Sequence, residues 1–318
     1  MTSAPTVNPR KIGRFRSEEA RVRFDEAYNN AIAAWPVPPR HVDVATRFGA
    51  THVLCAGPDT GTPIVLLHAL AVSSPSWFAN VEALSATHPV LAIDTMADVG
   101  RSEQTTPVRS GEDMSVWLDE VLESLGLEQV HLVGLSYGGW LALNQAQRSA
   151  RRLASVISVD PPNAVGRGQM SFLLKILPDS LLAIARSDKA LHRLLRRLNN
   201  GTTPTEPLLD LAVAGLRTFV GRLPTPKRLS DEDLRAIHTP CFLIFCAQSP
   251  INRPHRAVAR ARRLIAQVTT DVVEGAGHML PIEAPNVFAD RVLTFIDNLE
   301  AANRADDSDP VTGRPLAG

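Results

Sequence analysis

The pattern of apolar and polar positions predicts a helix and then a hairpin at the start of the chain. Within 17–34, small and apolar residues recur every three or four positions and prolines follow, which predicts one helix. Two short runs at 41–45 and 50–56, divided by a glycine, are typical of a β-hairpin. Residues 1–40 are therefore interpreted as an N-terminal extension that contains a helix.

After the hairpin, mostly apolar runs alternate with amphipathic segments. Such runs indicate strands that are buried on both faces of a parallel sheet, and the segments between them indicate helices. Right-handed crossovers would bring the C-terminal ends of these strands to one edge, where α/β proteins bind ligands. The strand runs are 63–68, 90–94, 130–134, 156–160, 241–246 and 268–274, and the helical segments are 75–86, 112–125, 137–149, 254–265 and 284–299.

Residues 163–235 interrupt this alternation. They show helical spacing around 191–198 and no clear strand, so we expect a helical cap that is inserted between two strands and covers the ligand edge. The core would then consist of 41–162 and 236–300. The polar segment 301–318 is expected to be a disordered tail.

Composition narrows the class of protein. The 318 residues include 33 Lys and Arg and 33 Asp and Glu, and 44% are apolar, which excludes a uniformly basic nucleic-acid binder and a disordered acidic chain. No run reaches the roughly 18–20 consecutive apolar residues of a membrane-spanning helix, and the first residues lack the apolar segment of a secretory signal. The 3 cysteines are few for this length and odd in number, which favours reduced thiols and a cytoplasmic location.

The strongest chemical motif is Gly134-Leu135-Ser136-Tyr137-Gly138-Gly139. It follows an apolar run and opens a helical segment, which is the pattern of a nucleophile elbow. Glycines are needed there because neighbouring backbone passes too close for a Cβ atom, and the helix N-terminus favours negative charge on the serine oxygen. The alternative is a helix N-cap serine with glycines nearby by chance.

The loop after the run 63–68 is a candidate for one side of an oxyanion hole. In that arrangement the backbone N–H of Leu70 (or Ala69) would bind the oxyanion together with the N–H of Tyr137, the residue after the nucleophile. His68 ends the run, and we expect it to fix the loop rather than act as a base.

His278 is the candidate general base and acid. It lies in the glycine-containing loop that follows the last strand run, at the same edge as Ser136. A structural role is the alternative for any single histidine. By adjacency to these groups, Ala69, Trp77, Tyr137 and Met279 are candidates for the lining of the substrate site.

Taken together, these motifs resemble the α/β-hydrolase family over roughly residues 40–300. The segments 34–38, 46–49 and 51–53 resemble its carboxylesterase branch. The resemblance implies an α/β-hydrolase fold, with a mostly parallel, doubly wound sheet of about eight strands and a helical cap. We expect no cofactor or metal, because the sequence contains no motif for one. The resemblance rests on the strand order, His68-Ala69, Asp94…Gly100-Arg101-Ser102, the serine elbow and Gly277-His278.

The triad acid departs from the family pattern. In the family it usually follows the strand before the last one, in a pattern such as G-x-x-D-P, and here that position holds Ser249, which cannot carry negative charge. Asp160 ends the run 156–160, the strand end that supplies the acid in members resembling haloalkane dehalogenases, and we assign it as the acid. Two alternatives remain open: no true acid, or another carboxylate such as Asp94 or Asp98.

The leading hypothesis is a serine hydrolase that cleaves a carboxylic ester of a small-molecule acyl substrate. Ser136 would attack the carbonyl carbon, His278 would transfer the proton, and Asp160 would orient His278. The sequence contains no P-loop, dinucleotide-binding fingerprint, H-E-x-x-H motif or paired Cys/His spacing. A serine nucleophile also disfavours dehalogenase and epoxide-hydrolase chemistry, which needs an aspartate there in the family.

Two other functions remain. Residues 163–230 contain 11 Lys and Arg against 4 Asp and Glu, a net charge of +7, which could attract an anionic substrate or an acidic carrier protein. That charge motivates acyl transfer, thioester hydrolysis or cyclisation on the same triad, although arginines on an amphipathic helix are commonly its solvated face. The serine at position 249 motivates a non-catalytic ligand binder.

Overall fold

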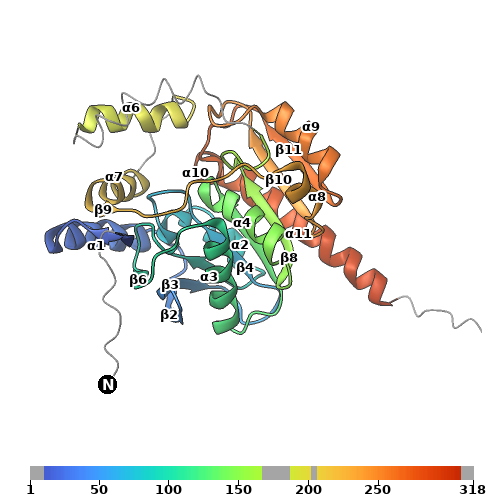
Figure 1. The fold of residues 1–318 in the computed structure, drawn as a ribbon, viewed down its shortest axis with the longest axis horizontal. Coiled ribbons are helices and arrows are strands. Elements are labelled where there is room, and N and C mark those ends of the chain that lie inside the picture. Colours follow the sequence, from blue (N-terminus) through green and yellow to red (C-terminus); the bar gives the residue numbers. More distant parts are fainter. Residues whose placement is uncertain (1–10, 167–186, 202–205, 309–318) are drawn as a thin grey trace, which may run out of the picture.

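The computed structural model describes residues 11–166, 187–201 and 206–308. Its centre is a nine-stranded sheet in the order β11-β10-β8-β7-β4-β5-β3-β2, with β6 paired to β3 (Figure 1). The six strands from β11 to β5 are parallel, and β2, β3 and β6 are antiparallel to their neighbours. The predicted fold class, a mostly parallel sheet of about eight strands, is confirmed. The strands are β2 (Arg40–Thr46), β3 (Gly49–Ala56), β4 (Ile64–Leu67), β5 (Val90–Ile93), β6 (Glu103–Gln104), β7 (Val130–Leu135), β8 (Leu153–Val159), β10 (Cys241–Cys246) and β11 (Val268–Val273).

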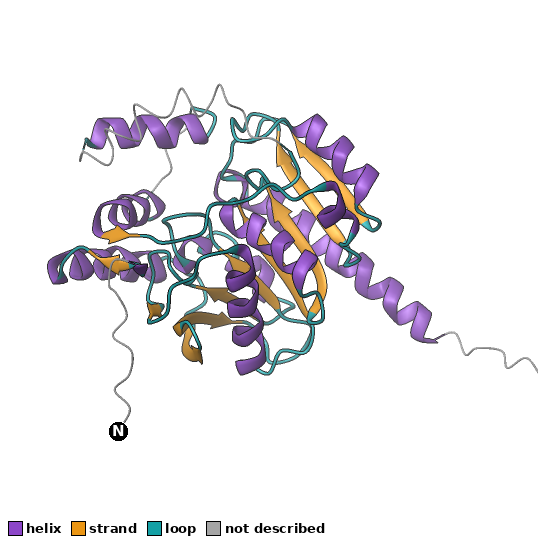
Figure 2. Cartoon of the chain, in the orientation of Figure 1, coloured by secondary structure: helices purple, strands orange, loops and turns teal. Residues whose placement is uncertain are grey.

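Helices cover both faces of the sheet (Figure 2). The strands alternate between two hydrophobic clusters, since Val65 and Leu67 belong to one and Ile64 and Leu66 to the other. The first cluster includes side chains of α3, α4, α8 and α9, and the second includes side chains of α2 and α11. Both faces of the central strands are therefore buried, which explains their continuous apolar runs. These helices are α2 (Val81–Ser85), α3 (Gly111–Ser124), α4 (Tyr137–Arg148), α8 (Asp231–Arg235), α9 (Pro254–Leu264) and α11 (Pro285–Ser308).

The N-terminal extension joins the core to the insertion. Its helix α1 (Glu18–Ala33) is capped by Ser17, whose hydroxyl accepts a hydrogen bond from the Ala20 amide. The helix packs against α7 (Leu208–Thr218), and the short strand β1 (Arg14–Phe15) pairs with β9 (Phe219–Val220) of the insertion (Figure 1).

The insertion contains α6 (Asp188–Leu198), α7, β9 and α8 among its described residues. The prediction that it holds no strand is wrong for Phe219–Val220, because two residues are too few to show strand periodicity. Helix α7 lies directly on the loop after β4, since a Cβ atom on Gly215 would overlap the carbonyl oxygen of Ala71. The parts of the predicted cap at 167–186 and 202–205 lie outside the described residues.

Two predicted segments differ from the structure. The helix expected at 75–86 is divided into a short 3₁₀ helix, η2 (Ser74–Trp77), and α2, because Pro75 starts the first element and the chain turns at Asn80 before the second. The disordered tail expected at 301–318 is wrong for 301–308, where α11 continues to Ser308. Arg304 there pairs with Glu300 one turn earlier. Residues 309–318 lie outside the described part of the chain.

None of the described helices is long and apolar enough to cross a membrane.

Candidate active site

Ser136 lies at a sharp turn between β7 and α4. Its backbone has φ 55° and ψ −115°, a strained conformation for a residue with a side chain. A Cβ atom on Gly134 would overlap the carbonyl of Gly138, and one on Gly138 would overlap the carbonyl of Leu67, so both glycines are required by close backbone approach. The Ser136 side chain makes no capping hydrogen bond to α4, which argues against the N-cap interpretation.

The structure brings Ser136, His278 and Asp160 together. His278 Nε2 lies 2.8 Å from Ser136 Oγ, and His278 Nδ1 lies 2.6 Å from Asp160 Oδ2. Since a carboxylate can only accept, Nδ1–H donates to Asp160, which leaves Nε2 to accept the serine hydroxyl proton. The side chains of His278 and Asp160 are 6% and 0% exposed, so water does not compete for the bond between them. This is the geometry of a nucleophile, a base and an orienting acid.

Asp160 has two further donors that the sequence did not reveal. The Ser249 hydroxyl donates to Oδ2, the oxygen that also accepts from His278, and Asn252 Nδ2 donates to Oδ1 at 2.8 Å. A buried carboxylate needs such donors because it has lost its hydration. Ser249, at the family's usual acid position, therefore contacts the carboxylate that is assigned as the acid from the sequence. No local motif marks Asn252.

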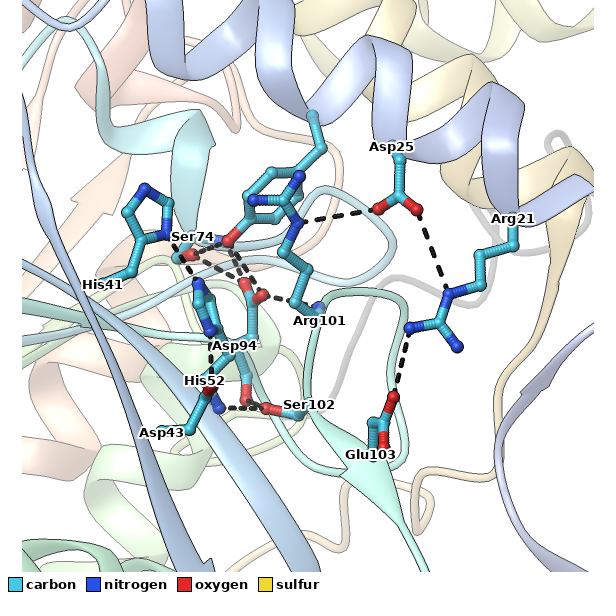
Figure 3. A network of polar contacts seen from close by, with 11 residues as sticks. Arg21, Asp25, His41, Asp43, His52, Ser74, Asp94, Arg101, Ser102 and Glu103 are labelled. Atoms are coloured by element: carbon cyan, nitrogen blue, oxygen red, sulfur yellow. Dashed lines mark hydrogen bonds and ion pairs between the residues drawn. The ribbon is translucent and has the colours of Figure 1, made fainter.

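The two alternative acids bind other groups. Asp94 Oδ1 accepts from the amide and hydroxyl of Ser74, and Oδ2 accepts from Tyr28 and the Arg101 amide (Figure 3). Asp98 accepts from the amides of Ala71 and Val99, and burial raises the pKa of its carboxyl. These bonds join each carboxylate to the loop after β4 and not to His278. The described residues contain no group of three or more side chains with the arrangement of a metal site.

His68 fixes the loop proposed for the oxyanion hole. Its Nε2 accepts from the Thr95 amide at 2.9 Å, so Nδ1 carries the proton and donates to the carbonyl of Ala69 at 2.7 Å. The peptide that joins Ala69 to Leu70 is planar and trans, so its N–H points away from the His68 ring. Tyr137 is the first residue of α4, where amides lack an intrahelical partner. Both amides remain predicted oxyanion donors.

Three of the predicted lining residues share a hydrophobic cluster with residues of α7. Ala69, Trp77 and Met279 belong to one hydrophobic cluster, which also includes Leu208 and Ala212 of α7. Their contact with substrate remains a prediction.

Trp77 and Tyr137 also make contacts elsewhere in the fold. The Trp77 ring stacks on Phe288 and is buried in the core. The Tyr137 hydroxyl donates to the Pro224 carbonyl, while Leu70 is 56% exposed.

The loop that carries His278 is held from two sides. The His278 amide donates to the carbonyl of Leu198, the last residue of α6, at 2.9 Å. Glu283, in α10 (Leu280–Glu283), accepts from the amides on both sides of His278, those of Gly277 at 2.7 Å and Met279 at 3.2 Å. The sequence did not reveal the role of Leu198, because its contact with His278 joins residues far apart in the chain. It did not reveal the role of Glu283 either, because no motif marks its bonds to the nearby amides.

Residues 64–291 match the alpha/beta hydrolase family. Carboxylesterase YbfK of Bacillus subtilis (strain 168) is 28% identical over 292 residues, which cover 89% of this chain and 96% of that protein. The crystal structure of naproxen esterase (carboxylesterase NP) from Bacillus subtilis has a TM-score of 0.81 at 27% identity, covering 87% of this chain and 98% of that one. The crystal structure of carboxylesterase CesB (YbfK) from the same organism has a TM-score of 0.80 at 26% identity, covering 87% and 98%.

Proposed function

The chain belongs to the alpha/beta hydrolase family, and from this premise we propose that it is a carboxylesterase that works through an acyl-enzyme intermediate. One observation carries the proposal: a hydrogen-bonded series from Ser136 through His278 to a buried carboxylate, Asp160. The carboxylesterases of Bacillus subtilis that resemble this chain over most of its length support ester hydrolysis as the reaction.

The geometry supports a two-step mechanism. Ser136 Oγ attacks the ester carbonyl while His278 Nε2 takes its proton, and Asp160 stabilises the imidazolium through Nδ1–H. The amides of Leu70 and Tyr137 would bind the oxyanion of the tetrahedral intermediate. When the intermediate collapses, His278 returns the proton to the leaving alcohol. Water, deprotonated by His278, then attacks the acyl-enzyme, releases the acid and restores Ser136.

The test is labelling of the serine by a fluorophosphonate probe, followed by turnover of p-nitrophenyl esters. We expect the wild type to be labelled and to turn over ester, and Ser136→Ala to do neither. Ser124→Ala, at the exposed end of α3, is the matched control and should behave as wild type. A wild type that is neither labelled nor faster than Ser136→Ala would contradict esterase activity and favour a ligand binder.

A second candidate is acyl transfer or thioester hydrolysis from an anionic or carrier-bound substrate. The observation that favours it is the exposed basic surface of α6, made by Lys189, Arg193, Arg196 and Arg197. The test compares kcat/KM for neutral and anionic acyl substrates between low and high salt. A preference for the anionic substrate that disappears at high salt would support this candidate, and salt-independent rates would oppose it.

A cytoplasmic location is proposed on the state of the thiols. Cys55, Cys241 and Cys246 are all buried and unpaired, as expected for a protein kept in a reducing compartment.

A further inference from the structure

Two hydrogen bonds meet at one oxygen of the proposed triad acid. Asp160 Oδ2 accepts from His278 Nδ1 at 2.6 Å and also from the hydroxyl of Ser249. The second oxygen, Oδ1, accepts from Asn252 Nδ2 at 2.8 Å. Three side chains from two segments, the loop after β10 and the loop after β11, therefore determine the orientation of the carboxylate.

The hydroxyl of Ser249 is itself oriented. The Ile251 amide donates to Ser249 Oγ at 3.2 Å, which uses a lone pair of that oxygen and leaves its O–H for Asp160. Asn252 is held similarly, since its Nδ2 also donates to the carbonyl of Pro161 at 3.2 Å. Ser249 and Asn252 are 3% and 1% exposed. These donors are therefore preorganised and do not exchange with water.

The carboxylate depends on them for two physical reasons. Asp160 is fully buried, so an ionised carboxylate there needs hydrogen-bond donors in place of its hydration shell. Its backbone has φ 43°, an uncommon conformation for a residue with a side chain, so its position is set by surrounding contacts and not by local preference. Donors on both oxygens prevent the group from rotating, which keeps Oδ2 directed at His278 Nδ1.

We propose that Ser249 and Asn252 are positioning residues that keep the Asp160 carboxylate directed at His278. This inference rests on the proposed esterase function. Their effect passes through Asp160 to the proton transfer at His278 and not to substrate, so their loss should lower kcat and leave KM nearly unchanged.

The experiment measures kcat and KM on a p-nitrophenyl ester for Ser249→Ala, Asn252→Ala and Ser249→Thr. Hydrogen bonds to charged groups are worth enough that each alanine variant should lose about 10- to 100-fold in kcat. Ser249→Thr retains the hydroxyl and should stay within about threefold of wild type, a recovery that general loss of packing would not give. The matched control is Ser155→Ala, which removes an equally buried serine hydroxyl that binds His131 in the core.

The outcomes separate this inference from the proposed function. Wild-type protein that fails to react with the fluorophosphonate probe or the ester would overturn the esterase proposal, whatever the variants do. With an active wild type, unchanged kcat in both alanine variants would overturn the positioning role. So would a loss confined to KM, or a loss in Ser249→Thr as large as that in Ser249→Ala. If Ser249→Ala does not fold, Ser249→Thr and Asn252→Ala still decide the question.

Discussion

At the scale of single residues, the proposed triad acid departs from the family pattern. Asp160 is buried at the end of β8, and its Oδ2 lies 2.6 Å from His278 Nδ1. We expect Asp160→Ser to lower kcat by about 10³- to 10⁴-fold, because the imidazolium loses its partner and the ring loses its fixed tautomer. The measurement is kcat on a p-nitrophenyl ester, with the exposed Asp290→Asn as a control that should keep wild-type activity.

The same geometry predicts a partial recovery. Ser249 Oγ already contacts the oxygen of Asp160 that binds His278, so a carboxylate on residue 249 would extend toward the same place. Asp160→Ser/Ser249→Asp should recover about 10-fold or more of the kcat that Asp160→Ser loses. A double variant no faster than the single one would contradict this placement.

The sequence pattern was enough to predict the proposed catalytic residues. It did not reveal the residues that only hold them in position. Ser136 and His278 lie in glycine-containing loops at strand ends, and Asp160 ends a strand run, so pattern and topology together were enough to select them. Asn252 contacts Asp160, 92 residues away in the chain, whereas Glu283 contacts the amides of the nearby residues Gly277 and Met279. Neither an asparagine in a loop nor a glutamate at the end of a short helix has a local signature for such a role, so only the structure reveals it.

At the scale of elements, buried strands were the easiest to predict. Residues 64–67 and 241–246 are covered on both faces, and their continuous apolar runs follow from that burial. Short elements were harder, since β1 and β9 have two residues each and exist because they pair with each other. The extension of α11 through 301–308 was missed because the segment is polar, which is also the composition of a tail, and its residues 301–305 are exposed.

Helix α1 is fixed to the core through Tyr28, whose hydroxyl donates to Asp94 at 3.0 Å, while the Arg101 guanidinium lies 4.2 Å from its ring centroid. Burial, and then Asp94, raise the pKa of Tyr28, so its O–H remains a donor. Tyr28→Phe removes a donor from a buried carboxylate and should lower the free energy of unfolding by about 1–3 kcal/mol in urea titrations. Val22→Ala, on the exposed side of α1, should change it by less than about 0.5 kcal/mol. Equal effects of the two substitutions would contradict this role for Tyr28.

The end of α6 should control the position of His278. A Cβ atom on Gly277 would lie 2.6 Å from Glu283 Oε1 and 2.8 Å from the carbonyl carbon of Asn199, so Gly277→Ala must push the His278 loop away from α6. We expect kcat to fall about 100-fold, since small displacements of catalytic groups are costly. Gly166→Ala is the control, because its Cβ would meet Ala257 at an ordinary 3.6 Å. Full activity in Gly277→Ala, measured on the same ester, would show that the α6 contact does not position the base.

At the scale of the whole molecule, the neutral total charge conceals an uneven distribution. The insertion is basic by sequence, and the exposed arginines of α6 lie on the same helix whose last carbonyl binds the His278 amide. The N-terminal extension contacts the insertion through α1 and α7, and α7 lies on the loop after β4. Residues that are distant in sequence thus support the two loops on which the proposed chemistry depends.

Global stability should fall on mild acidification because of His131, in the central strand β7. Its Nδ1 faces the Ser155 hydroxyl at 2.8 Å and its Nε2 faces Glu300 of α11 at 3.3 Å. Burial lowers the pKa of His131, and the hydrogen bond to Glu300 only partly opposes this. As pH falls below about 6.5, the unfolded chain therefore binds a proton at this residue before the folded chain does.

This histidine should then contribute a loss of up to about 1.4 kcal/mol in unfolding free energy per pH unit between pH 6.5 and its lowered folded-state pKa, and none above pH 7.5. Urea titrations from pH 8 to pH 5 measure it as the difference between wild type and His131→Gln. The variant is less stable at pH 8, because it loses the buried imidazole contacts, but its stability falls less steeply below pH 6.5. His238→Gln, at an exposed position, should keep the wild-type slope. Parallel pH profiles for wild type and His131→Gln would mean that protonation of this core histidine does not limit stability, and that the acid sensitivity originates elsewhere in the fold.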